Sequence, residues 1–486
     1  MVGKITTREN EQNMDGKLKQ RVSYALGAFG HDIFYAALST YFMVFVTSAM
    51  FTGADKATTG KMIGIITSLV VVIRLVEIIF DPIIGGVIDN TKTRFGKFKP
   101  WLVIGGVVSS ILLACIFTNF FGLAIHNTTL FIILFAIVYL LLGSFYSFKD
   151  IALWSMIPAL STETKERGKL ATFARLGSVI GANGTTLAVV PIVTFFTFLM
   201  TGEDSQGASG WFWFGLIAAV ISGGTAIITA LGTKENESVI RQQQEKASPK
   251  DMFKAIAKND QLMWLALSYI AYAIANGVTN AVFFFFFKYI LGNSGEFWIV
   301  GLIAAVVGLI AVSLFPMLTK LISRRFIYIG GIAMMLLAYV CFSLAGTSLP
   351  MVIVGLVLFY FPHQLIFLSA LMTITDSVEY GQWKNGTRNE AVTLSIRPLL
   401  DKLAGALSNG IIGFLAVAAG MTGNATAADI TAHGVSTFHL YAFYLPAALM
   451  IFSAIIFTWK ITLTEKKHAQ IVKELETKLN YSEKAN

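Results

Sequence analysis

The stretch VVIRLVEIIFDPIIGGVIDN, residues 71–90, combines a membrane-like composition with several ionisable side chains. It is apolar enough to lie inside a lipid bilayer, yet it contains Arg74, Glu77, Asp81 and Asp89. An ionisable side chain at the centre of a bilayer costs at least about 2.5–3.5 kcal/mol, so such residues usually face a bundle interior and mark a path for an ion or a substrate. On a helix Arg74, Glu77 and Asp81 share one face, because they are spaced i, i+3 and i+7.

The composition of the whole chain also indicates a membrane protein. Of its 486 residues 55% are hydrophobic and 13% are charged, and the mean hydropathy is +0.68. Soluble domains are typically about one-quarter charged. The net charge of +9 arises from basic residues in short loops between apolar runs, which is typical of membrane topology rather than of nucleic-acid binding. Cys115 and Cys341 lie far apart in apolar runs, so neither a disulfide framework nor a cysteine metal site is expected.

Apolar segments long enough to cross a bilayer follow one another with short breaks. They lie roughly at residues 22–50, 60–89, 101–120, 129–158, 170–200, 211–232, 260–291, 296–319, 326–346, 349–375, 391–421 and 435–462. The sequence therefore predicts an all-α membrane protein with about twelve transmembrane helices.

The longest polar break divides these helices into two sets of six. A faint repeat agrees, since VSYALGAFGHD at 22–32 resembles LSYIAYAIANG at 267–277, and such repetition is typical of secondary transporters. The predicted parts of the chain are an N-terminal segment 1–21, a six-helix bundle 22–232, a linker 233–259, a second six-helix bundle 260–462 and a tail 463–486.

Lysine and arginine in the loops predict the orientation. Breaks after even-numbered helices are basic, as in NTKTRFGKFKP at 90–100, whereas breaks after odd-numbered helices, such as TGEDSQGASG at 201–210, are nearly free of both cations. Both termini are therefore expected in the cytoplasm, on a multi-pass protein of the cell (inner) membrane.

Polar residues within other predicted helices suggest a substrate rich in hydroxyl groups. Asp32, Asp150 and Arg175 supply hydrogen-bond acceptors and donors, and Trp154 supplies an aromatic face. Carboxylates near the middle of the membrane can also hold a cation, and burial of a carboxylate favours its protonated form.

Some of the charged residues also have structural interpretations that the sequence leaves open. Arg74 and Glu77 can form a tether between helices. Asp376 and Glu379 can belong to a solvated helix end rather than to a site.

Other features are expected to be structural. His31 and His363 are interpreted as hydrogen-bonded packing residues rather than proton relays, and the phenylalanines at 283–287 are expected to face lipid. The sequence contains no phosphate-binding loop, no His/Cys cluster with metal-ligand spacing and no pore loop. We therefore expect neither an enzyme nor a bound cofactor or metal.

Two motifs carry a resemblance to a known family. FDPIIGGVIDNTKTRFGKFKPW (80–101) and DSVEYGQWKNGTRNEAVTLSIRPLLDKLAGALSNGIIG (376–413) resemble the signatures of the glycoside–pentoside–hexuronide:cation symporters, a branch of the major facilitator superfamily. The resemblance continues through SYALGAFGHDIFYAALSTYF (23–42), FYSFKDIALWSMIPALS (145–161) and ATFARLGSVIGAN (171–183). Within the family these runs look most like the lactose and galactoside permeases of Gram-positive bacteria. The resemblance implies the major facilitator fold.

The resemblance also implies a sugar site. Asp32 and Asp150 match the sugar-binding carboxylates of the melibiose carriers in this family. Trp154 and Arg175 match the neighbours of those carboxylates in the sugar site.

A cation-coupling site is implied as well. Glu77 and Asp81 match the acidic pair that binds the coupling cation, and Lys402 matches a lysine near that site. Glu390 matches a glutamate tied to proton coupling in the lactose permeases, and Arg74 is assigned to the same site because it shares the face of Glu77.

Taken together, the resemblance implies uptake of a galactoside of the lactose, melibiose or raffinose type in symport with protons, and it permits sugar exchange. Glu77 stands where the sodium-using melibiose carriers have aspartate, which favours the proton over sodium. Thr387 stands where close lactose permeases have histidine, which leaves the sugar range and the coupling open. The alternatives are a sodium-coupled or pentoside/glucuronide symporter of the same family and a sugar sensor that does not transport.

Overall fold

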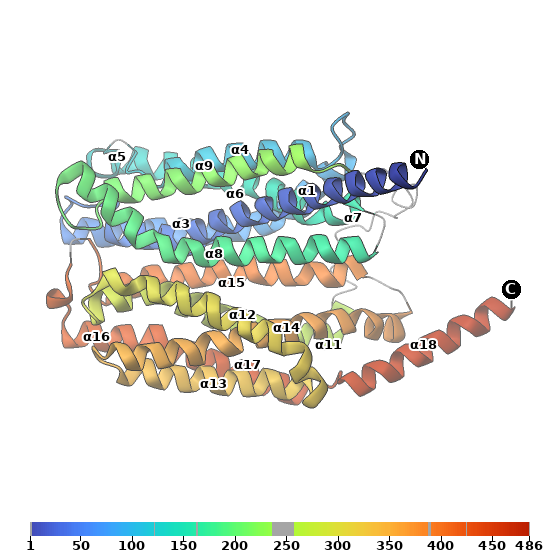
Figure 1. Cartoon of the computed structure of the whole chain (residues 1–486). Coiled ribbons are helices and arrows are strands. Elements are labelled where there is room, and N and C mark those ends of the chain that lie inside the picture. The colour runs from blue at the N-terminus through green and yellow to red at the C-terminus, as the bar shows by residue number, and fades with distance from the viewer. Residues whose placement is uncertain are drawn as a thin grey trace. The chain divides into compact units, whose positions relative to one another are not determined.

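The computed structural model describes residues 2–120, 122–161, 164–235, 257–386, 390–423 and 425–485. These residues contain helices and no strand, and 12 of the helical segments are long and apolar enough to cross a membrane (Figure 1). The spans are Gly16–Ser48, Lys56–Ile88, Lys99–Ile116, Thr128–Ser155, Lys169–Thr201, Ala208–Gly232, Asp260–Ile290, Ser294–Leu321, Arg324–Leu344, Leu349–Asn385, Leu399–Ala418 and Ala432–Lys460. The predicted all-α membrane fold is thereby confirmed.

The chain divides into two compact units. Unit 1 comprises Met1–Gln244, Gly295–Gly301 and Met421–Ala425, and unit 2 comprises Glu245–Ser294, Leu302–Gly420 and Thr426–Asn486. Most of the predicted linker 233–259 lies outside the described residues.

Unit 1 contains the first six spans. Its elements are α1 (Val2–Ala36), the π-helical turn η1 (Ala37–Tyr41), α2 (Phe42–Ser48), α3 (Lys56–Asn90), α4 (Lys99–Ile116), α5 (Leu123–His126), α6 (Thr128–Ser155), α7 (Ile157–Leu160), α8 (Thr164–Thr201) and α9 (Ala208–Gly232). Because α1 begins at Val2, the predicted N-terminal segment and the first span form one continuous helix.

Side-chain caps begin several of these helices. The Asp55 carboxylate accepts hydrogen bonds from the backbone N–H groups of Ala57 and Thr58 at the start of α3. Asn127 accepts from the N–H of Leu130 at the start of α6. Each cap satisfies backbone donors that a helix leaves unpaired in its first turn.

Small residues let α1 pack closely between α8 and α9. A Cβ atom on Gly177 or Gly181 of α8 would lie 2.2 or 2.3 Å from backbone oxygens of α1, so only glycine permits this approach. On the side facing α9, Gly27 and Gly30 of α1 lie against the side chains of threonines. This packing fixes the position of α1 against the helices around it.

Unit 2 repeats the arrangement of unit 1. Its elements are α11 (Asp260–Phe285), the π-helical turn η3 (Phe286–Ile290), η4 (Ser294–Phe297), α12 (Trp298–Leu321), α13 (Arg324–Leu344), α14 (Leu349–Asn385), α15 (Glu390–Ala418), η5 (Ala427–Asp429), α16 (Ala432–His439), η6 (Leu440–Tyr444), α17 (Leu445–Lys460) and α18 (Glu465–Ala485). Most of η4 and the start of α12, through Gly301, are grouped with unit 1. In unit 1, α1 packs on α8 and α9, and α4 packs on α6 and α9. In unit 2 the corresponding helices pair in the same way: α11 on α15 and α17, and α13 on α14 and α17.

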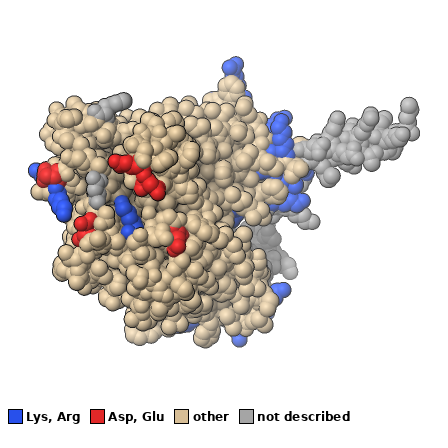
Figure 2. Space-filling model, turned by 60° about the vertical axis from the view of Figure 1, so that its left-hand side comes forward, with Lys and Arg blue, Asp and Glu red and all other residues tan. Residues whose placement is uncertain are grey.

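The outer surface of the spans is apolar. Ile79, Leu231 and Phe326 are 69%, 81% and 68% exposed, which is expected of side chains that face lipid. Most of the surface in Figure 2 lacks charged side chains, and lysine and arginine appear in separate small groups on both sides of the view.

The prediction that phenylalanines 283–287 face lipid is wrong. All five are buried, with exposed fractions of 0–1%. Within unit 2 the ring of Phe283 lies 5.1 Å from that of Phe342, and the ring of Phe286 lies 5.7 Å from that of Phe443. Lipid and the interior of a membrane bundle are equally apolar, so hydrophobicity alone does not distinguish the two faces of a helix.

Candidate functional site

His31 joins two predicted sugar-site carboxylates that come from different helices of unit 1. Its Nε2 atom lies 3.3 Å from Asp150 Oδ1 on α6 and 3.9 Å from Asp32 Oδ1 on α1. His31 is 4% exposed, whereas the side chains of Asp32 and Asp150 retain 22% and 19% exposure. We call these three residues the carboxylate cluster. Carboxylate oxygens on these partly exposed side chains suit the hydroxyl groups of a ligand.

Aromatic rings surround the carboxylate cluster. Tyr146 stacks on His31 at a centroid distance of 5.3 Å, and its hydroxyl lies 3.2 Å from His31 Nε2. Trp154 meets His31 edge-on at 6.0 Å and is 39% exposed. An exposed indole beside carboxylates is the combination that sugar recognition requires, because the C–H face of a pyranose packs on an aromatic ring.

Basic residues complete the surroundings of the cluster. Arg175 of α8 interacts electrostatically with Asp32. Lys149 is 1% exposed, and its ammonium group donates a 2.6 Å hydrogen bond to Ser222 of α9. The structure therefore brings Asp32, Asp150, Trp154 and Arg175 into one neighbourhood of unit 1.

A second buried group forms where α3 meets α6. Arg74 Nη1 lies 3.6 Å from Glu77 Oε2, and Arg74 Nε donates a 3.2 Å hydrogen bond to the Tyr139 hydroxyl. Arg74 and Glu77, which we call the Arg74–Glu77 pair, are 5% and 3% exposed. Glu77 also packs over Gly143, where a Cβ atom would lie 1.6 Å from Glu77 Oε1. Arg74 thus connects α3 to α6 through Tyr139, as in the tether that the sequence left open, and the ionisable pair is enclosed in the bundle.

One face of α6 carries the contacts of both groups. Tyr139 and Gly143 contact the Arg74–Glu77 pair. Asp150 is a member of the carboxylate cluster, and Tyr146 contacts the cluster through His31. Their spacing of i, i+4, i+7 and i+11 places all four positions in one stripe along the helix. The two groups therefore lie about two helical turns apart on α6.

The remaining predicted coupling residues lie on α3 and α15. Asp81 follows Glu77 by one turn of α3 and is partly buried. Lys402 lies on α15 in unit 2, next to Asp401. Thr387 lies outside the described residues, and the side chain of Glu390 is likewise not described.

Unit 2 has polar contacts of its own at corresponding helices. The Tyr269 hydroxyl donates a 2.9 Å hydrogen bond to Asp401, and Asp401 lies 3.7 Å from Arg397 on α15. His363 Nδ1 lies 2.6 Å from the Tyr272 hydroxyl, which agrees with the interpretation of His363 as a hydrogen-bonded packing residue.

Asp376 and Glu379 form a docking site for α18 rather than a solvated helix end. Arg324, at the start of α13, forms an ion pair with Asp376 and donates to Glu465 of the α18 start through its backbone N–H (2.7 Å) and Nε (3.2 Å). His468 lies 3.5 Å from Glu379. Burial raises the pKa of Glu465, but the hydrogen bonds and charge of Arg324 outweigh it and hold that pKa below its usual range.

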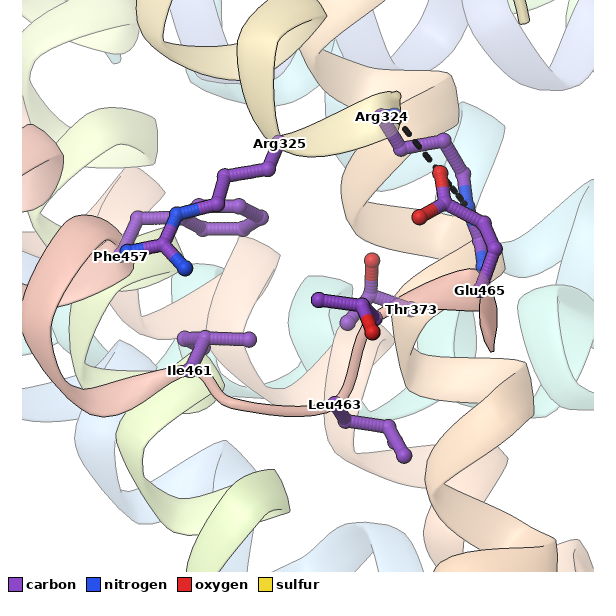
Figure 3. A pocket seen from close by; sticks show the side chains of 8 residues that line it. Arg324, Arg325, Thr373, Phe457, Ile461, Leu463 and Glu465 are labelled. Atoms are coloured by element: carbon purple, nitrogen blue, oxygen red, sulfur yellow. Dashed lines mark hydrogen bonds and ion pairs between the residues drawn. The ribbon is translucent and has the colours of Figure 1, made fainter. Parts of the chain in front are cut away.

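Figure 3 shows a small pocket beside this docking site. Arg324 and Glu465 are joined on one side of it, and Arg325 extends toward Phe457 on the other. The pocket also contains Leu463 and adjoins the end of α17, so it is distant along the chain from both groups of unit 1. We assign it no part in sugar binding.

Sequence reasoning missed the central position of His31. The interpretation of His31 as a packing residue agrees with its hydrogen bond to Tyr146, but its contact with both carboxylates was not expected. The available signals were its place next to Asp32 and the four-residue spacing of Tyr146 and Asp150. Among the described residues, no group of three or more His, Cys, Asp or Glu side chains is arranged to hold a metal ion.

Known proteins resemble this chain along nearly its whole length. A family model described as MFS/sugar transport protein matches residues 23–465. A lactose permease of Leuconostoc lactis is 50% identical over 484 residues, covering 99% of this chain and 75% of that protein. A raffinose carrier protein of Pediococcus pentosaceus is 45% identical over 457 residues, covering 94% of this chain and 71% of that protein. Among solved structures, a mutant of the nucleoside transporter NupG has a TM-score of 0.62 at 14% identity, covering 91% of this chain and 99% of that one, which shows a shared fold.

Proposed function

The chain belongs to the family of MFS/sugar transport proteins, as the resemblance of its motifs implied, and from this premise we propose that it carries a galactoside across the cell membrane together with a proton. It is a sugar transporter and not an enzyme, and the part of the chain that the structure describes contains 12 candidate spans. The names of the relatives support a galactoside, because lactose and raffinose both contain a galactosyl unit. The basic loops support an orientation with both termini in the cytoplasm.

The observation that carries the proposal is the bridging of Asp32 and Asp150 by His31 beside an exposed tryptophan. In this scheme the two carboxylates accept hydrogen bonds from galactosyl hydroxyl groups, Arg175 donates to the sugar, and Trp154 packs against its apolar face. The imidazole lies beside both carboxylates, so its protonation and hydrogen bonding affect the acceptors that the sugar meets.

Coupling is assigned to the Arg74–Glu77 pair and to Asp81, with Lys402 and Glu390 assisting as the family resemblance implies. A deprotonated carboxylate that moves through a dry intermediate meets a large desolvation penalty, and protonation removes its charge. The sugar-loaded, protonated carrier can therefore reorient, whereas the sugar-loaded, unprotonated carrier is held back. The two six-helix halves of the predicted domain division are the bodies that reorient, and exchange of one sugar for another requires no net proton movement.

Right-side-out vesicles test the function. Addition of lactose, melibiose or raffinose is expected to alkalinise a weakly buffered exterior, and unlabelled sugars are expected to compete according to their galactosyl content. Sodium-dependent uptake without a pH change contradicts proton coupling, and failure of labelled galactoside counterflow contradicts transport altogether.

Glu77→Gln tests the coupling site. This variant is expected to lose uphill accumulation while it retains counterflow, because the sugar site remains intact and the titratable group is gone. Asp55→Asn serves as the control, since the Asp55 side chain caps the start of the same helix at the exposed surface and asparagine caps equally well. Undiminished accumulation by Glu77→Gln removes Glu77 from the mechanism.

A further inference from the structure

Tyr146 lies between the Arg74–Glu77 pair and the carboxylate cluster on the shared face of α6. Its side chain is 3% exposed, and its ring stacks on Phe34 at 4.8 Å with an interplanar angle of 3°. Tyr35 stacks on the ring of Tyr146 at a centroid distance of 6.4 Å. The hydroxyl of Tyr146 lies 3.2 Å from His31 Nε2, the same nitrogen that faces Asp32 and Asp150.

Tyr35 extends this contact toward the Arg74–Glu77 pair. The Tyr35 phenol contributes to the electrostatic surroundings of Arg74, and its ring packs on that of Tyr146. Tyr146 also follows Gly143, the residue that Glu77 covers, by one turn of α6. Tyr146, with the partly buried Tyr35 stacked on its ring, thus lies one turn of α6 from the glycine that Glu77 covers and in contact with His31.

We propose that Tyr146, supported by Tyr35, is the positioning residue through which the charge of Glu77 controls the sugar affinity of the carboxylate cluster. This inference rests on the proposed function, because it assumes that the cluster binds sugar and that Glu77 titrates during transport.

The link has two discrete arrangements. A tyrosine hydroxyl and an imidazole nitrogen can each donate or accept a hydrogen bond. When His31 Nε2 carries a proton, it donates to a carboxylate and holds the cluster closed. When Tyr146 donates to a bare Nε2, the carboxylates lose this donor and accept hydrogen bonds from the sugar instead. The proton of the imidazole then resides on Nδ1, so no net charge is created.

The charge of Glu77 selects between these arrangements. When Glu77 is ionised, its negative charge largely compensates the positive charge of Arg74. When Glu77 is protonated, the positive charge of Arg74 is no longer compensated and acts on Tyr35 and Tyr146 through a poorly polarisable interior. A positive field at the ring edge makes the Tyr146 hydroxyl a better donor, which favours its hydrogen bond to Nε2. Protonation of Glu77 is therefore expected to raise sugar affinity, and this is the direction that symport requires.

A double-mutant cycle tests the link through sugar binding alone. The Kd for a galactoside is measured in detergent for the unaltered protein, for Glu77→Gln as a mimic of protonated glutamate, for Tyr146→Phe, and for the double variant. We expect Glu77→Gln to lower Kd about fivefold or more in the unaltered background, which is the lower end of typical coupling between sites, and a rise in Kd would overturn the link. In the Tyr146→Phe background the same substitution is expected to change Kd less than about twofold.

Tyr41→Phe is the matched control. Tyr41 is a buried tyrosine of unit 1 whose hydroxyl donates a 2.9 Å hydrogen bond to Thr186, away from both groups. In its background the effect of Glu77→Gln on Kd should be unchanged. Tyr35→Phe, which leaves the Tyr146 hydroxyl in place, provides a second variant that should weaken the coupling if Tyr146→Phe does not fold.

The outcomes separate this inference from the proposed function. An equal effect of Glu77→Gln in the unaltered and Tyr146→Phe backgrounds overturns the link but leaves the sugar and coupling sites standing. No effect of Glu77→Gln on Kd in any background also overturns the link. No galactoside binding by the unaltered protein contradicts the proposed function itself.

Discussion

Glu77 covers Gly143 so closely that α6 has no room for a side chain at this position. The hypothetical Cβ atom would lie 1.6 Å from Glu77 Oε1 and 2.3 Å from the carboxylate carbon. The buried carboxylate therefore occupies space that is free only because residue 143 is glycine, and it also lies beside Arg74.

Gly143→Ala is expected to disable coupling by displacing Glu77. Forcing a buried side chain out of a packed position costs about 1–3 kcal/mol, so accumulation of sugar should fall about tenfold while counterflow persists. Gly64→Ala is the control, because Gly64 lies on the same helix as Glu77 and a Cβ atom there meets no atom within 4 Å. Equal accumulation by the two variants would show that the position of Glu77 does not matter.

The sequence predicted the spans and the family because both depend on local information. A run of apolar residues of bilayer length requires a helix whatever surrounds it. His31 was harder to interpret, because its contact with Asp150 depends on how α1 packs against its neighbours, through glycines such as Gly177 and Gly181. The phenylalanines at 283–287 were misassigned for a related reason, since hydrophobicity does not reveal which apolar face meets protein.

Phe286→Ala tests the corrected assignment. Because Phe286 is 0% exposed and packs on other rings of unit 2, its truncation should lower the free energy of unfolding by about 3–5 kcal/mol. Phe326→Ala removes a ring that is 68% exposed and should have little effect, about 0.5 kcal/mol or less. Thermal unfolding of the purified variants in detergent compares them, and similar midpoints would contradict the burial of Phe286.

The pairing of Glu166 with Arg21 predicts a pH-dependent contribution to stability. Arg21 Nε and Nη2 donate hydrogen bonds of 2.7 and 2.6 Å to the two Glu166 oxygens, and these bonds hold the pKa of that carboxyl below its usual range. A carboxyl with a depressed folded-state pKa stabilises the fold above its unfolded-state value of about 4.3 and loses this effect as the pH falls through the folded-state value.

Glu166→Gln should therefore destabilise the protein by about 1–3 kcal/mol at pH 7, as expected for the loss of hydrogen bonds between charged groups. The difference in unfolding midpoint between the variant and the unaltered protein should close as the pH falls below about 4. Glu203→Gln, at an exposed position, provides the comparison. A difference that stays constant down to the lowest pH at which the protein folds would exclude the ion pair as its cause.

Arg324 is expected to control the docking of α18. It joins Asp376 of α14 to Glu465, and its removal leaves these two carboxylates facing each other without their shared cation. Arg324→Gln should therefore loosen α18 and favour its unwinding around the exposed Lys473. Trypsin should then cleave there about fivefold faster if docking loses about 1 kcal/mol. Arg325→Gln is the matched control, because Arg325 has the same charge at the adjacent position but donates to the Thr458 carbonyl of α17.

Cleavage is followed by mass spectrometry of the released C-terminal peptide. Equal rates for the two variants would mean that apolar packing of Leu463 and Ile471 against Tyr380 holds α18 without help from the ion pairs.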